Sequence, residues 1–315
     1  MPLHLRPVNA EVDYPRLARL ESLWDAVPVS AEELRHLESS RSAGTIFHRI
    51  VIVDDAGWIA GTAKAIHTPE DPAGHFFVVV IVDPTVRRQG IGTQLYDAIL
   101  AFAREYKAVV LETIAGEGTP GALTFAWGRD FTIHRQLSES TLDLTAFDPR
   151  RFTATIARVT AGGIRFLAWA ELEGTDGQER TLYELYTAMA RDAPGGEARP
   201  PAPFEQFRRD VLESPTFLAD GLILAVADER WIGLTHLVQS EPDLMYNQFT
   251  GVLREFRGRG IALGLKLAAI AVCRRYGVAQ VKTINDAQNG AMLAINRTLG
   301  YAPEPNAYIL RKEPA

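Results

Sequence analysis

The sequence has very little cysteine and lacks the features of an exported or membrane-spanning protein. Its single cysteine, Cys273, cannot form an intrachain disulfide, and it lies in an apolar helical pattern where we expect a core position. Apolar runs such as 76–82 are far too short to cross a bilayer and are typical of buried strands. Arg6 and Asp13 interrupt the N-terminal segment, which therefore contains no apolar signal core. We expect a soluble, cytoplasmic protein with no membrane partner.

A strong excess of charge of one sign is also missing. The formal net charge is -6, and the content of 23% charged and 47% hydrophobic residues is typical of a folded globular protein. The composition therefore predicts no nucleic-acid partner. The spacing of histidines and carboxylates predicts no metal site. A length of 315 residues is sufficient for two ordinary domains.

The sequence contains an internal duplication. When residues 87–131 are placed over residues 257–301 without a gap, eleven of 45 positions are identical. About three identities would be expected by chance, so the match indicates a duplicated domain and not a short solenoid repeat. The identical pairs include Arg87/Arg257, Gly90/Gly260, Ile91/Ile261, Leu95/Leu265, Tyr106/Tyr276, Thr113/Thr283 and Leu123/Leu293.

The segments around this match follow the same order in both halves. Each half begins with an expected strand, at 3–8 and 164–169, and continues with helical patterns and a pair of strands joined by a short polar turn. One further strand follows, at 76–82 in the first half and 245–253 in the second. Strands with interspersed helices predict an α+β fold, with a mixed, mostly antiparallel sheet flanked by helices in each half.

The boundary between the two copies is predicted from residues that break regular structure. Asp148 and Pro149 interrupt the pattern shortly before the second opening strand. The sequence therefore predicts an N-terminal domain over 1–148 and a C-terminal domain over 149–315.

The most informative motif is a strand followed by Arg-x-x-Gly-x-Gly/Ala and then a helical pattern. It reads RRQGIG from Arg87 and RGRGIA from Arg257. The start of a helix offers backbone N–H groups without intrahelical acceptors, and its dipole favours an anion. Glycine lets the backbone approach a diphosphate closely, and arginine adds fixed positive charge. One such turn is also compatible with a plain helix start, but two copies at matching positions favour a pair of phosphate-binding turns.

RRQGIG and RGRGIA resemble the acetyl-CoA pyrophosphate loop of the GNAT N-acetyltransferase superfamily, and the element order agrees with that fold in both halves. The second half is most similar to the C-terminal halves of tandem actinobacterial-type GNAT proteins. The resemblance implies two tandem GNAT folds and direct transfer of an acetyl or other acyl group from acetyl-CoA to an amine. It also implies that the strand backbone before each loop binds the pantetheine arm, while loop amides hold the pyrophosphate. The implied CoA-binding residues are Ile81, Val82, Arg87, Arg88, Gln89, Gly90, Ile91, Gly92 and Thr93 in the first half, and Gly251, Val252, Leu253, Arg257, Gly258, Arg259, Gly260, Ile261, Ala262, Asn285 and Asn289 in the second.

The general acid of the family has no direct counterpart here. Many GNAT members place a tyrosine on the last helix, four residues before a Gly-Phe pair, to protonate the leaving thiolate. The corresponding residues are Asn296 in the second half and Ala126 in the first. Asparagine donates a hydrogen bond but is a poor acid, and alanine does neither. Asn296 is the candidate that faces the leaving group, and an unassisted or water-assisted departure of the thiolate remains open.

The second half keeps more of the family pattern and is the predicted catalytic copy. Asn285 follows a strand, and Asn289 and Asn296 share one helix face. The plainer interpretation of these amides is a helix cap and polar surface groups. The matching first-half stretch, 115–120, contains no such amides, so the first half is expected to bind CoA without turnover or to act as a scaffold.

A general base is less evident than the CoA loop. Tyr246 and Gln248 lie two residues apart on the strand before the second loop and share one sheet face, so Tyr246 is the catalytic candidate there. His236 lies on the neighbouring strand, and the first half offers His75 and Glu112. Each of these side chains could instead be simply exposed, with a base acting through water.

Two further interpretations remain besides catalysis in the second half. The first half, or both halves, could be active, and a non-catalytic CoA sensor or scaffold is compatible with the missing tyrosines. A dinucleotide-binding oxidoreductase is disfavoured because neither glycine turn follows the first strand of its half. The resemblance implies that the acceptor is an amine of a small molecule or peptide, and the protein is expected to be a monomer or homodimer.

Overall fold

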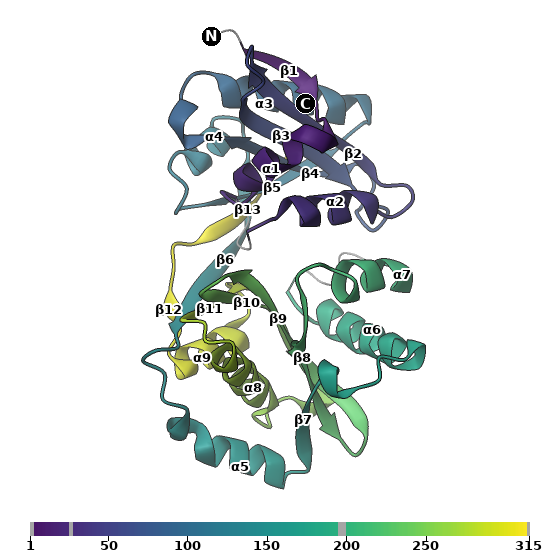
Figure 1. Ribbon diagram of the computed structural model, residues 1–315, viewed down its shortest axis with the longest axis vertical. Coiled ribbons are helices and arrows are strands. Elements are labelled where there is room, and N and C mark those ends of the chain that lie inside the picture. Colours follow the sequence, from purple (N-terminus) through teal and green to yellow (C-terminus); the bar gives the residue numbers. More distant parts are fainter. Residues whose placement is uncertain (1–2, 25–27, 195–199, 314–315) are drawn as a thin grey trace. The chain divides into compact units, whose positions relative to one another are not determined.

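The computed structural model describes residues 3–24, 28–194 and 200–313 (Figure 1). The chain divides into two compact units. The first unit contains the chain up to Gln136 together with the segment from Ala307 onward, and the second unit is Leu137–Asn306.

The elements of the first unit agree with the predicted order, and the described bounds are as follows. They are β1 (Leu3–Pro7), α1 (Ala10–Glu21), α2 (Ala31–Ser39), β2 (Ile46–Asp54), β3 (Ile59–His67), β4 (His75–Val82), the short η1 (Pro84–Val86), α3 (Ile91–Glu105), β5 (Val110–Gly116), α4 (Ala122–Trp127), the beginning of β6 (Thr132–Asp143), and β13 (Ala307–Lys312).

The second unit repeats this order after a linker helix. Its elements are the remainder of β6, η2 (Pro149–Phe152), α5 (Thr153–Ala161), β7 (Ile164–Ala168), η3 (Trp169–Glu171), α6 (Asp176–Arg191), α7 (Phe204–Phe207), η5 (Arg208–Leu212), β8 (Phe217–Ala227), β9 (Arg230–Glu241), β10 (Leu244–Val252), η6 (Arg254–Phe256), α8 (Ile261–Arg275), β11 (Gln280–Asp286), α9 (Gly290–Leu299) and β12 (Ala302–Pro303).

The first unit is a sheet with helices on both faces. Its strands follow the order β1-β2-β3-β4-β5-β13, antiparallel except for the parallel pair β4 and β5. Alternate residues of β2 supply the two cores: Ile50 and Ile52 pack in the cluster of α3, whereas Val51 and Val53 pack in the cluster of α1 and α2. Continuous apolar runs of this kind form strands that are covered on both faces.

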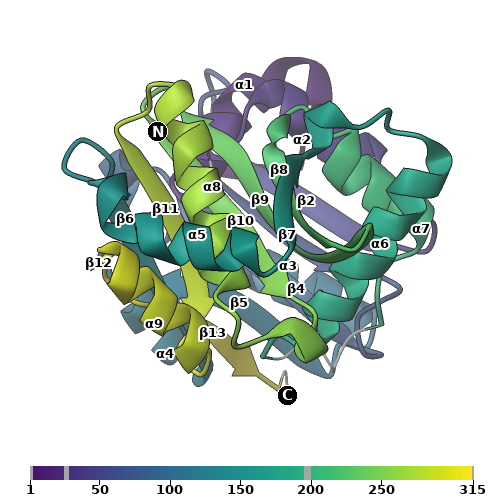
Figure 2. The ribbon, with the colours of Figure 1, turned by 90° about the horizontal axis from the view of Figure 1, so that it is seen from below.

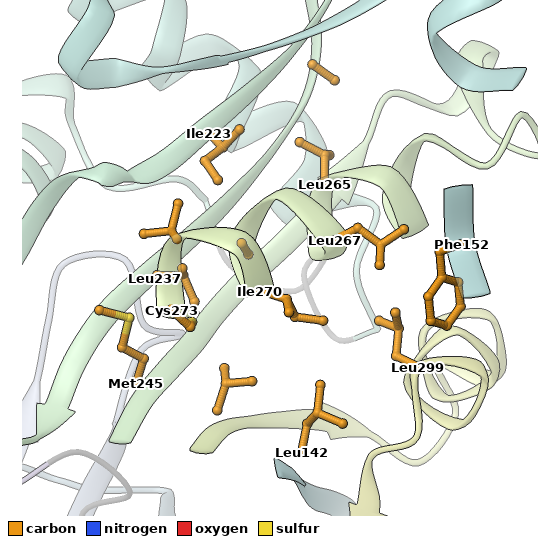
Figure 3. Close-up of a cluster of buried hydrophobic side chains, with 14 of the residues drawn as sticks. Leu142, Phe152, Ile223, Leu237, Met245, Leu265, Leu267, Ile270, Cys273 and Leu299 are labelled. Atoms are coloured by element: carbon orange, nitrogen blue, oxygen red, sulfur yellow. The ribbon is translucent and has the colours of Figure 1, made fainter. Parts of the chain in front are cut away.

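The second unit has the same layered arrangement. Its strands follow the order β6-β11-β10-β9-β8-β7, and β10 and β11 form the parallel pair. On β8, Ile223 and Ala225 pack toward α8, whereas Leu222 and Leu224 pack toward α6 and α7 (Figure 2). Figure 3 shows the first of these cores, in which the fully buried Cys273 lies among the side chains of α8, as expected from the apolar pattern.

Local sequence signals explain where the helices begin. Ser30 accepts a hydrogen bond from the Glu33 amide, and the Glu33 carboxylate accepts one from the Ser30 amide. Thr175 and Gln178 form the same reciprocal capping box at the start of α6. These caps supply partners for amides that the first turn of a helix leaves without acceptors.

The two units each contain a terminal strand from the other half of the sequence. β13, the last strand of the chain, pairs with β5 of the first unit from Ala307 to Lys312. The part of β6 from Leu137 to Asp143 pairs with β11 of the second unit. The first compact unit is therefore made of two segments and the second of one, whereas the predicted boundary between residues 148 and 149 divides the chain according to its duplication.

Candidate functional site

In each unit two parallel strands separate after a few paired residues. β4 pairs with β5 over residues 75–77 only, and β10 pairs with β11 over residues 244–246 only. Beyond these points each strand continues alongside its antiparallel neighbour, β3 or β9. The later residues of β4 and β10 therefore present one backbone edge on which a ligand can form hydrogen bonds. Ile81, Val82 and residues 251–253 lie in or directly after these segments.

β10 contains one residue more than its counterpart β4. β4 runs in unbroken register with β3 from Phe77 to Val82, whereas the pairing of β10 with β9 shifts between Asn247 and Phe249. Gln248 is the extra residue. A bulge leaves one residue outside the ladder and bends the strand. In the second unit it therefore frees backbone groups directly after the point where β10 and β11 separate.

The glycine turns lie between each of these strands and the following helix. Gly90 precedes α3 with a φ of 81°, and Gly260 precedes α8 with a φ of 80°, the left-handed conformation that glycine adopts without strain. Within the described residues, no backbone carbonyl accepts a hydrogen bond from the amides of residues 88–92 or 258–262. These amides lie at positive helix ends, so each turn has the geometry of a phosphate-binding site.

Arg87 and Arg257 hold the loops in place in addition to carrying charge. Nε of Arg87 donates a hydrogen bond to the carbonyl oxygen of Val82 at 3.1 Å. Nε of Arg257 donates to the carbonyl oxygen of Val252 at 3.0 Å. Each arginine thus joins the loop to the strand before it, which explains why the same residue type stands at both positions of the duplication.

The second loop carries ion pairs with a carboxylate from α6. Asp192, at the C-terminal end of α6, accepts hydrogen bonds at 2.8 Å from Nη2 of Arg254 and at 2.8 Å from Nη2 of Arg257. The Arg254 guanidinium, with Arg257, lowers the pKa of the Asp192 carboxyl. An anion bound at this loop would therefore compete with Asp192 for both guanidinium groups.

The first loop contains a strained arginine. Arg88 is exposed and has a φ of 65°, where the second unit has Gly258 with a φ of 79°. The left-handed conformation costs a non-glycine residue about 1–2 kcal/mol. Strain of this kind is retained where a side chain is needed, which favours a ligand contact for Arg88.

A further arginine lies at the first turn of α3 and was not found from the sequence. Nη2 of Arg129 donates to Oγ1 of Thr93 at 2.7 Å, and its guanidinium carbon is 3.6 Å from the ring centroid of Phe125. A Cβ atom at Gly92 would lie 3.1 Å from the same ring, so this glycine permits close packing of α4 on α3. The arrangement adds a positive charge beside the first loop.

The second unit encloses a lysine near its separating strands. Lys266 on α8 is 1% exposed, and its Nζ donates to Oδ1 of Asn247 at 2.8 Å. Burial lowers the pKa of Lys266 to about 7. Oγ1 of Thr283 on β11 donates to the Asn247 carbonyl at 3.0 Å and bridges the two strands where their ladder ends. Tyr96 stands at the corresponding position of α3, so this polar group is specific to the second unit.

The predicted asparagines have different roles. Nδ2 of Asn296 donates to Oδ1 of Asn285 at 2.7 Å, so the structure brings these two side chains together. Asn296 is 2% exposed, and its Oδ1 has no hydrogen-bond partner in the part of the chain that the structure describes. Asn289 instead caps α9, because its Oδ1 accepts from the Met292 amide at 3.2 Å.

The comparisons with known proteins agree with this geometry. Residues 15–120, within the first unit, match the model of the acetyltransferase (GNAT) family. A tandem GNAT protein from the clavulanic acid biosynthesis pathway has a similar structure over 100% of this chain and 99% of its own, with a TM-score of 0.77 and 22% identity. This chain has the fold of two tandem GNAT domains. The family match covers part of the first unit, and the assignment of the second rests on its fold.

Other tandem-length structures share the GNAT fold. A GCN5-related N-acetyltransferase from Sphaerobacter thermophilus covers 99% of this chain and 96% of its own, with a TM-score of 0.68 and 22% identity. A putative acetyltransferase from Pyrococcus horikoshii covers 99% and 89%, with a TM-score of 0.58 and 10% identity. No curated protein sequence matches the chain. These structures confirm the predicted fold class of two tandem GNAT folds.

The candidate bases lie in different surroundings. Tyr246 is buried and pairs with Val238 of β9, and Gln248 and His236 line a pocket together with Val238. In the first unit, Glu112 accepts a hydrogen bond from Nε of Arg311 at 2.7 Å. The polar candidates that share a pocket are therefore in the second unit.

The described residues contain neither a candidate metal site nor a helix that could span a membrane. Residues 3–24, 28–194 and 200–313 contain no group of three histidine, cysteine, aspartate or glutamate side chains placed to hold a metal ion. Within the same ranges, no helix combines the length and apolar character that a membrane span requires.

Sequence reasoning missed Asp192, Arg129 and Lys266. Asp192 and Arg129 are far in sequence from the loops they approach, so no local pattern relates them. Lys266 did leave a signal, because it is the single charged residue in the apolar stretch that follows Gly260 up to Cys273. A lysine within such a stretch indicates either a position facing solvent or a buried polar network.

Proposed function

We propose that this protein transfers an acetyl or other acyl group from acetyl-CoA to a primary amine of a small molecule or peptide, and that the second unit carries out the chemistry. The observation that carries the proposal is the order of features along β10: a separating parallel pair, a bulge at Gln248, and then the loop around Gly260 with unbonded amides. A thioester needs these parts in this order, because its carbonyl and its diphosphate lie at opposite ends of an extended arm.

The reaction follows from the groups that the second unit presents. The neutral amine attacks the thioester carbonyl carbon, a carbon–nitrogen bond forms, the carbon–sulfur bond breaks, and the nitrogen gives up one proton to water. Backbone N–H groups of β10 near the bulge stabilise the developing oxyanion. The thiolate leaves with a proton from water, and the amide of Asn296 lies at the family position that faces the leaving group. Asn285 fixes the orientation of Asn296 through their 2.7 Å hydrogen bond.

The diphosphate of CoA would be held by the amides of residues 258–262, with Arg254 and Arg257 released from Asp192 to take part. The first unit offers the same kind of loop over residues 88–92, with Arg88 and Arg129 as additional cations. We propose that the first unit also binds CoA. Its β4 has no counterpart of the Gln248 bulge along its pairing with β3, so its expected role is binding without turnover.

A second candidate function is catalysis by the first unit. The observation that favours it is the absence of a competing carboxylate among the described partners of its loop arginines, in contrast to Asp192 in the second unit. A non-catalytic CoA sensor is the alternative from another class. Both alternatives predict CoA binding. Catalysis by the first unit predicts that this unit releases thiol, whereas a sensor predicts that neither unit does.

The test is release of free CoA thiol from acetyl-CoA in the presence of a panel of primary amines. We expect amine-dependent thiol release and an acetylated product detected by mass spectrometry. A Gly260→Val variant should lose this turnover, whereas Gly90→Val should retain it. Retention by Gly260→Val with loss in Gly90→Val would assign the chemistry to the first unit, and binding without any turnover would support the sensor.

We further propose that the protein is cytoplasmic, that it requires no metal ion, and that it is a monomer or homodimer. The single buried thiol of Cys273 fits a reducing compartment but does not require one. Direct amine attack needs no metal ion, because backbone donors stabilise the oxyanion.

A further inference from the structure

We infer that a small pocket with His236 at its floor is the subsite of the second unit that receives the amino group of the acceptor, and that His236 is its proton acceptor. This inference rests on the proposed acyl transfer. It assigns a subsite and a chemical class of ligand to a surface of the second unit that faces away from α8.

The pocket lies between the sheet and the segment that follows α7. It has a volume of about 40 Å³ and is lined by Asp210, Val211, Ser214, Thr216, Phe217, His236, Val238 and Gln248. Asp210 and Gln248 are exposed and form its rim, whereas His236 is 3% exposed. The pocket is therefore open at a charged and polar mouth and ends at an imidazole.

His236 is the feature that calls for a ligand. In the described part of the chain neither Nδ1 nor Nε2 has a hydrogen-bond partner. A buried polar group without a partner typically costs about 1–3 kcal/mol, and His236 has two such atoms in one side chain. Burial lowers the pKa of His236 to about 4, so at neutral pH the ring is uncharged and has one nitrogen lone pair available as an acceptor.

The lining selects an amino group. Asp210 supplies a carboxylate at the mouth, one oxygen of which accepts a hydrogen bond from Nε2 of Gln206 at 2.8 Å. The hydroxyl groups of Ser214 and Thr216 hydrogen-bond to each other at 3.0 Å and have further lone pairs that can accept. A volume of about 40 Å³ is enough for a small polar group such as –NH₂ or –NH₃⁺. The remainder of the acceptor would stay outside, which fits a primary amine on a larger molecule.

The same position in the first unit is closed. Judged by strand pairing, Lys64 on β3 faces Val79 as His236 on β9 faces Phe249. The Lys64 ammonium forms an ion pair at 2.5 Å with Glu21, which is 2% exposed. The first unit therefore fills this position with a charge pair, and the second unit has a buried imidazole that lines a pocket.

The pocket also adjoins the bulge. Gln248 is both the extra residue of β10 and part of the pocket rim. An amine seated beside His236 would thus approach the strand segment that is proposed to hold the thioester carbonyl. Before attack, the ammonium passes one N–H proton to the free imidazole nitrogen, and this proton leaves through the mouth at Asp210. As the carbon–nitrogen bond forms and the carbon–sulfur bond breaks, the second N–H proton passes to water and the thiolate takes a proton from water.

Binding can be tested without turnover. The full-length protein, labelled with ¹⁵N in its histidine rings, is titrated with methylammonium chloride and, as a size control, with tetramethylammonium chloride. We expect saturable shifts of the ring signals that disappear in His236→Asn, caused by methylammonium and not by the larger ion. His134→Asn, which removes an exposed histidine of β6, should leave these shifts intact. No shift of the His236 signals would overturn the inference.

Kinetics separate the role of His236 from mere structure. Propylamine is ionised at neutral pH and must lose a proton, whereas hydroxylamine is already neutral. We expect His236→Asn to reduce kcat/KM for propylamine by about 10²-fold, the usual contribution of a general base, and to change the value for hydroxylamine by less than about threefold. Equal losses with both nucleophiles would indicate a structural role and overturn the assignment of the proton acceptor.

Different results would contradict the acyl transfer and the ammonium subsite at His236. Methylammonium binding at His236 without any release of thiol from acetyl-CoA would leave the ammonium subsite standing and contradict acyl transfer. Thiol release that depends on amines, together with unchanged His236 ring signals, would leave acyl transfer standing and contradict the subsite. A His236→Phe variant fills the pocket and, with its thermal unfolding checked, should abolish methylammonium binding without losing the fold.

Discussion

Asp192 holds Arg257 of the loop before α8 through a 2.8 Å hydrogen bond between Oδ2 and Nη2. The same carboxylate binds Arg254 through its other oxygen, so one side chain from the end of α6 neutralises two cations at a predicted phosphate site. Asp192 therefore neutralises two guanidinium groups that would otherwise be available to a bound diphosphate.

Substitution Asp192→Asn should strengthen acetyl-CoA binding to the second unit. The change removes a negative charge that competes with the diphosphate, and because the ion pairs are partly exposed the gain should be modest, about three- to tenfold in Kd. Isothermal titration calorimetry with acetyl-CoA measures it. Asp176→Asn at the other end of α6, which pairs with Arg180, is the matched control. Weaker binding by Asp192→Asn would contradict the competition.

The two glycine turns can be separated by substitution. Valine at Gly90 or Gly260 would require a β-branched residue at a φ near 80°, and it would place a side chain among the loop amides. We expect Gly90→Val to remove the binding of acetyl-CoA by the first unit and Gly260→Val that by the second. Calorimetric titration of each variant and of the double variant counts the sites. Unchanged stoichiometry in either single variant would show that its loop does not bind CoA.

Arg88→Gly should weaken ligand binding by the first unit without lowering its stability. Glycine removes the cost of a left-handed arginine, so the free energy of unfolding should stay unchanged or rise by up to about 1 kcal/mol. Acetyl-CoA binding by the first unit should weaken several-fold because a guanidinium is lost. Lys107→Gly is the control, because Lys107 also has a positive φ, of 56°, and lies at the far end of α3. Equal effects of the two variants on binding would contradict a ligand contact of Arg88.

The buried Lys266 should make stability depend on pH. Its pKa is lowered from 10.5 to about 7 in the folded state, so between these values the unfolded chain binds one proton more than the folded chain. The contribution of Lys266 to the free energy of unfolding therefore rises with pH from about 7 to about 10.5, by up to ~1.4 kcal/mol per pH unit, and is constant below this window.

Lys266→Met should remove this slope. Asn247 keeps a donor in the variant, because Oγ1 of Thr250 also donates to its Oδ1, at 3.0 Å. Chemical denaturation of wild type and variant at several pH values gives the difference, which should change with pH in the stated window. Lys282→Met, on β11, is the control. A constant difference between wild type and Lys266→Met would contradict the shifted pKa.

Leu310 connects the end of the chain to the stability of the first unit. It is 0% exposed and lies in the same core as Ile91 and Leu95 of α3. We expect Leu310→Ala to cost about 2–5 kcal/mol and to expose the first unit to proteolysis. Limited proteolysis with mass spectrometry identifies the cleaved segments. Ile309→Ala, at a half-buried neighbouring position, should cost less; cleavage confined to residues 153–299 in Leu310→Ala would contradict the prediction.

Much of the fold follows from local patterns. The duplication, the strand pairs and the Arg-x-x-Gly turns are visible because each depends on residues close in sequence, and the described elements follow the predicted order. The exchange of β6 and β13 between units could not be predicted, because a strand pattern shows that a segment is extended and not which strand it pairs with. The Gln248 bulge was hidden for the same reason, since it appears only when β10 is compared with β9.

The sequence by itself determined the class of fold and the positions of the two glycine turns before α3 and α8, because glycine conformation and helix ends are encoded within a few residues. Tertiary structure alone decided that Asp192 meets Arg257, that Lys266 is buried against Asn247 and that His236 faces a pocket without a partner. Those contacts join residues from separate elements. Burial shifts the pKa values of these side chains and raises the free-energy cost of leaving them without hydrogen-bond partners. Only tertiary packing decides which side chains far apart in sequence are buried together, so these contacts can be seen only in the folded chain.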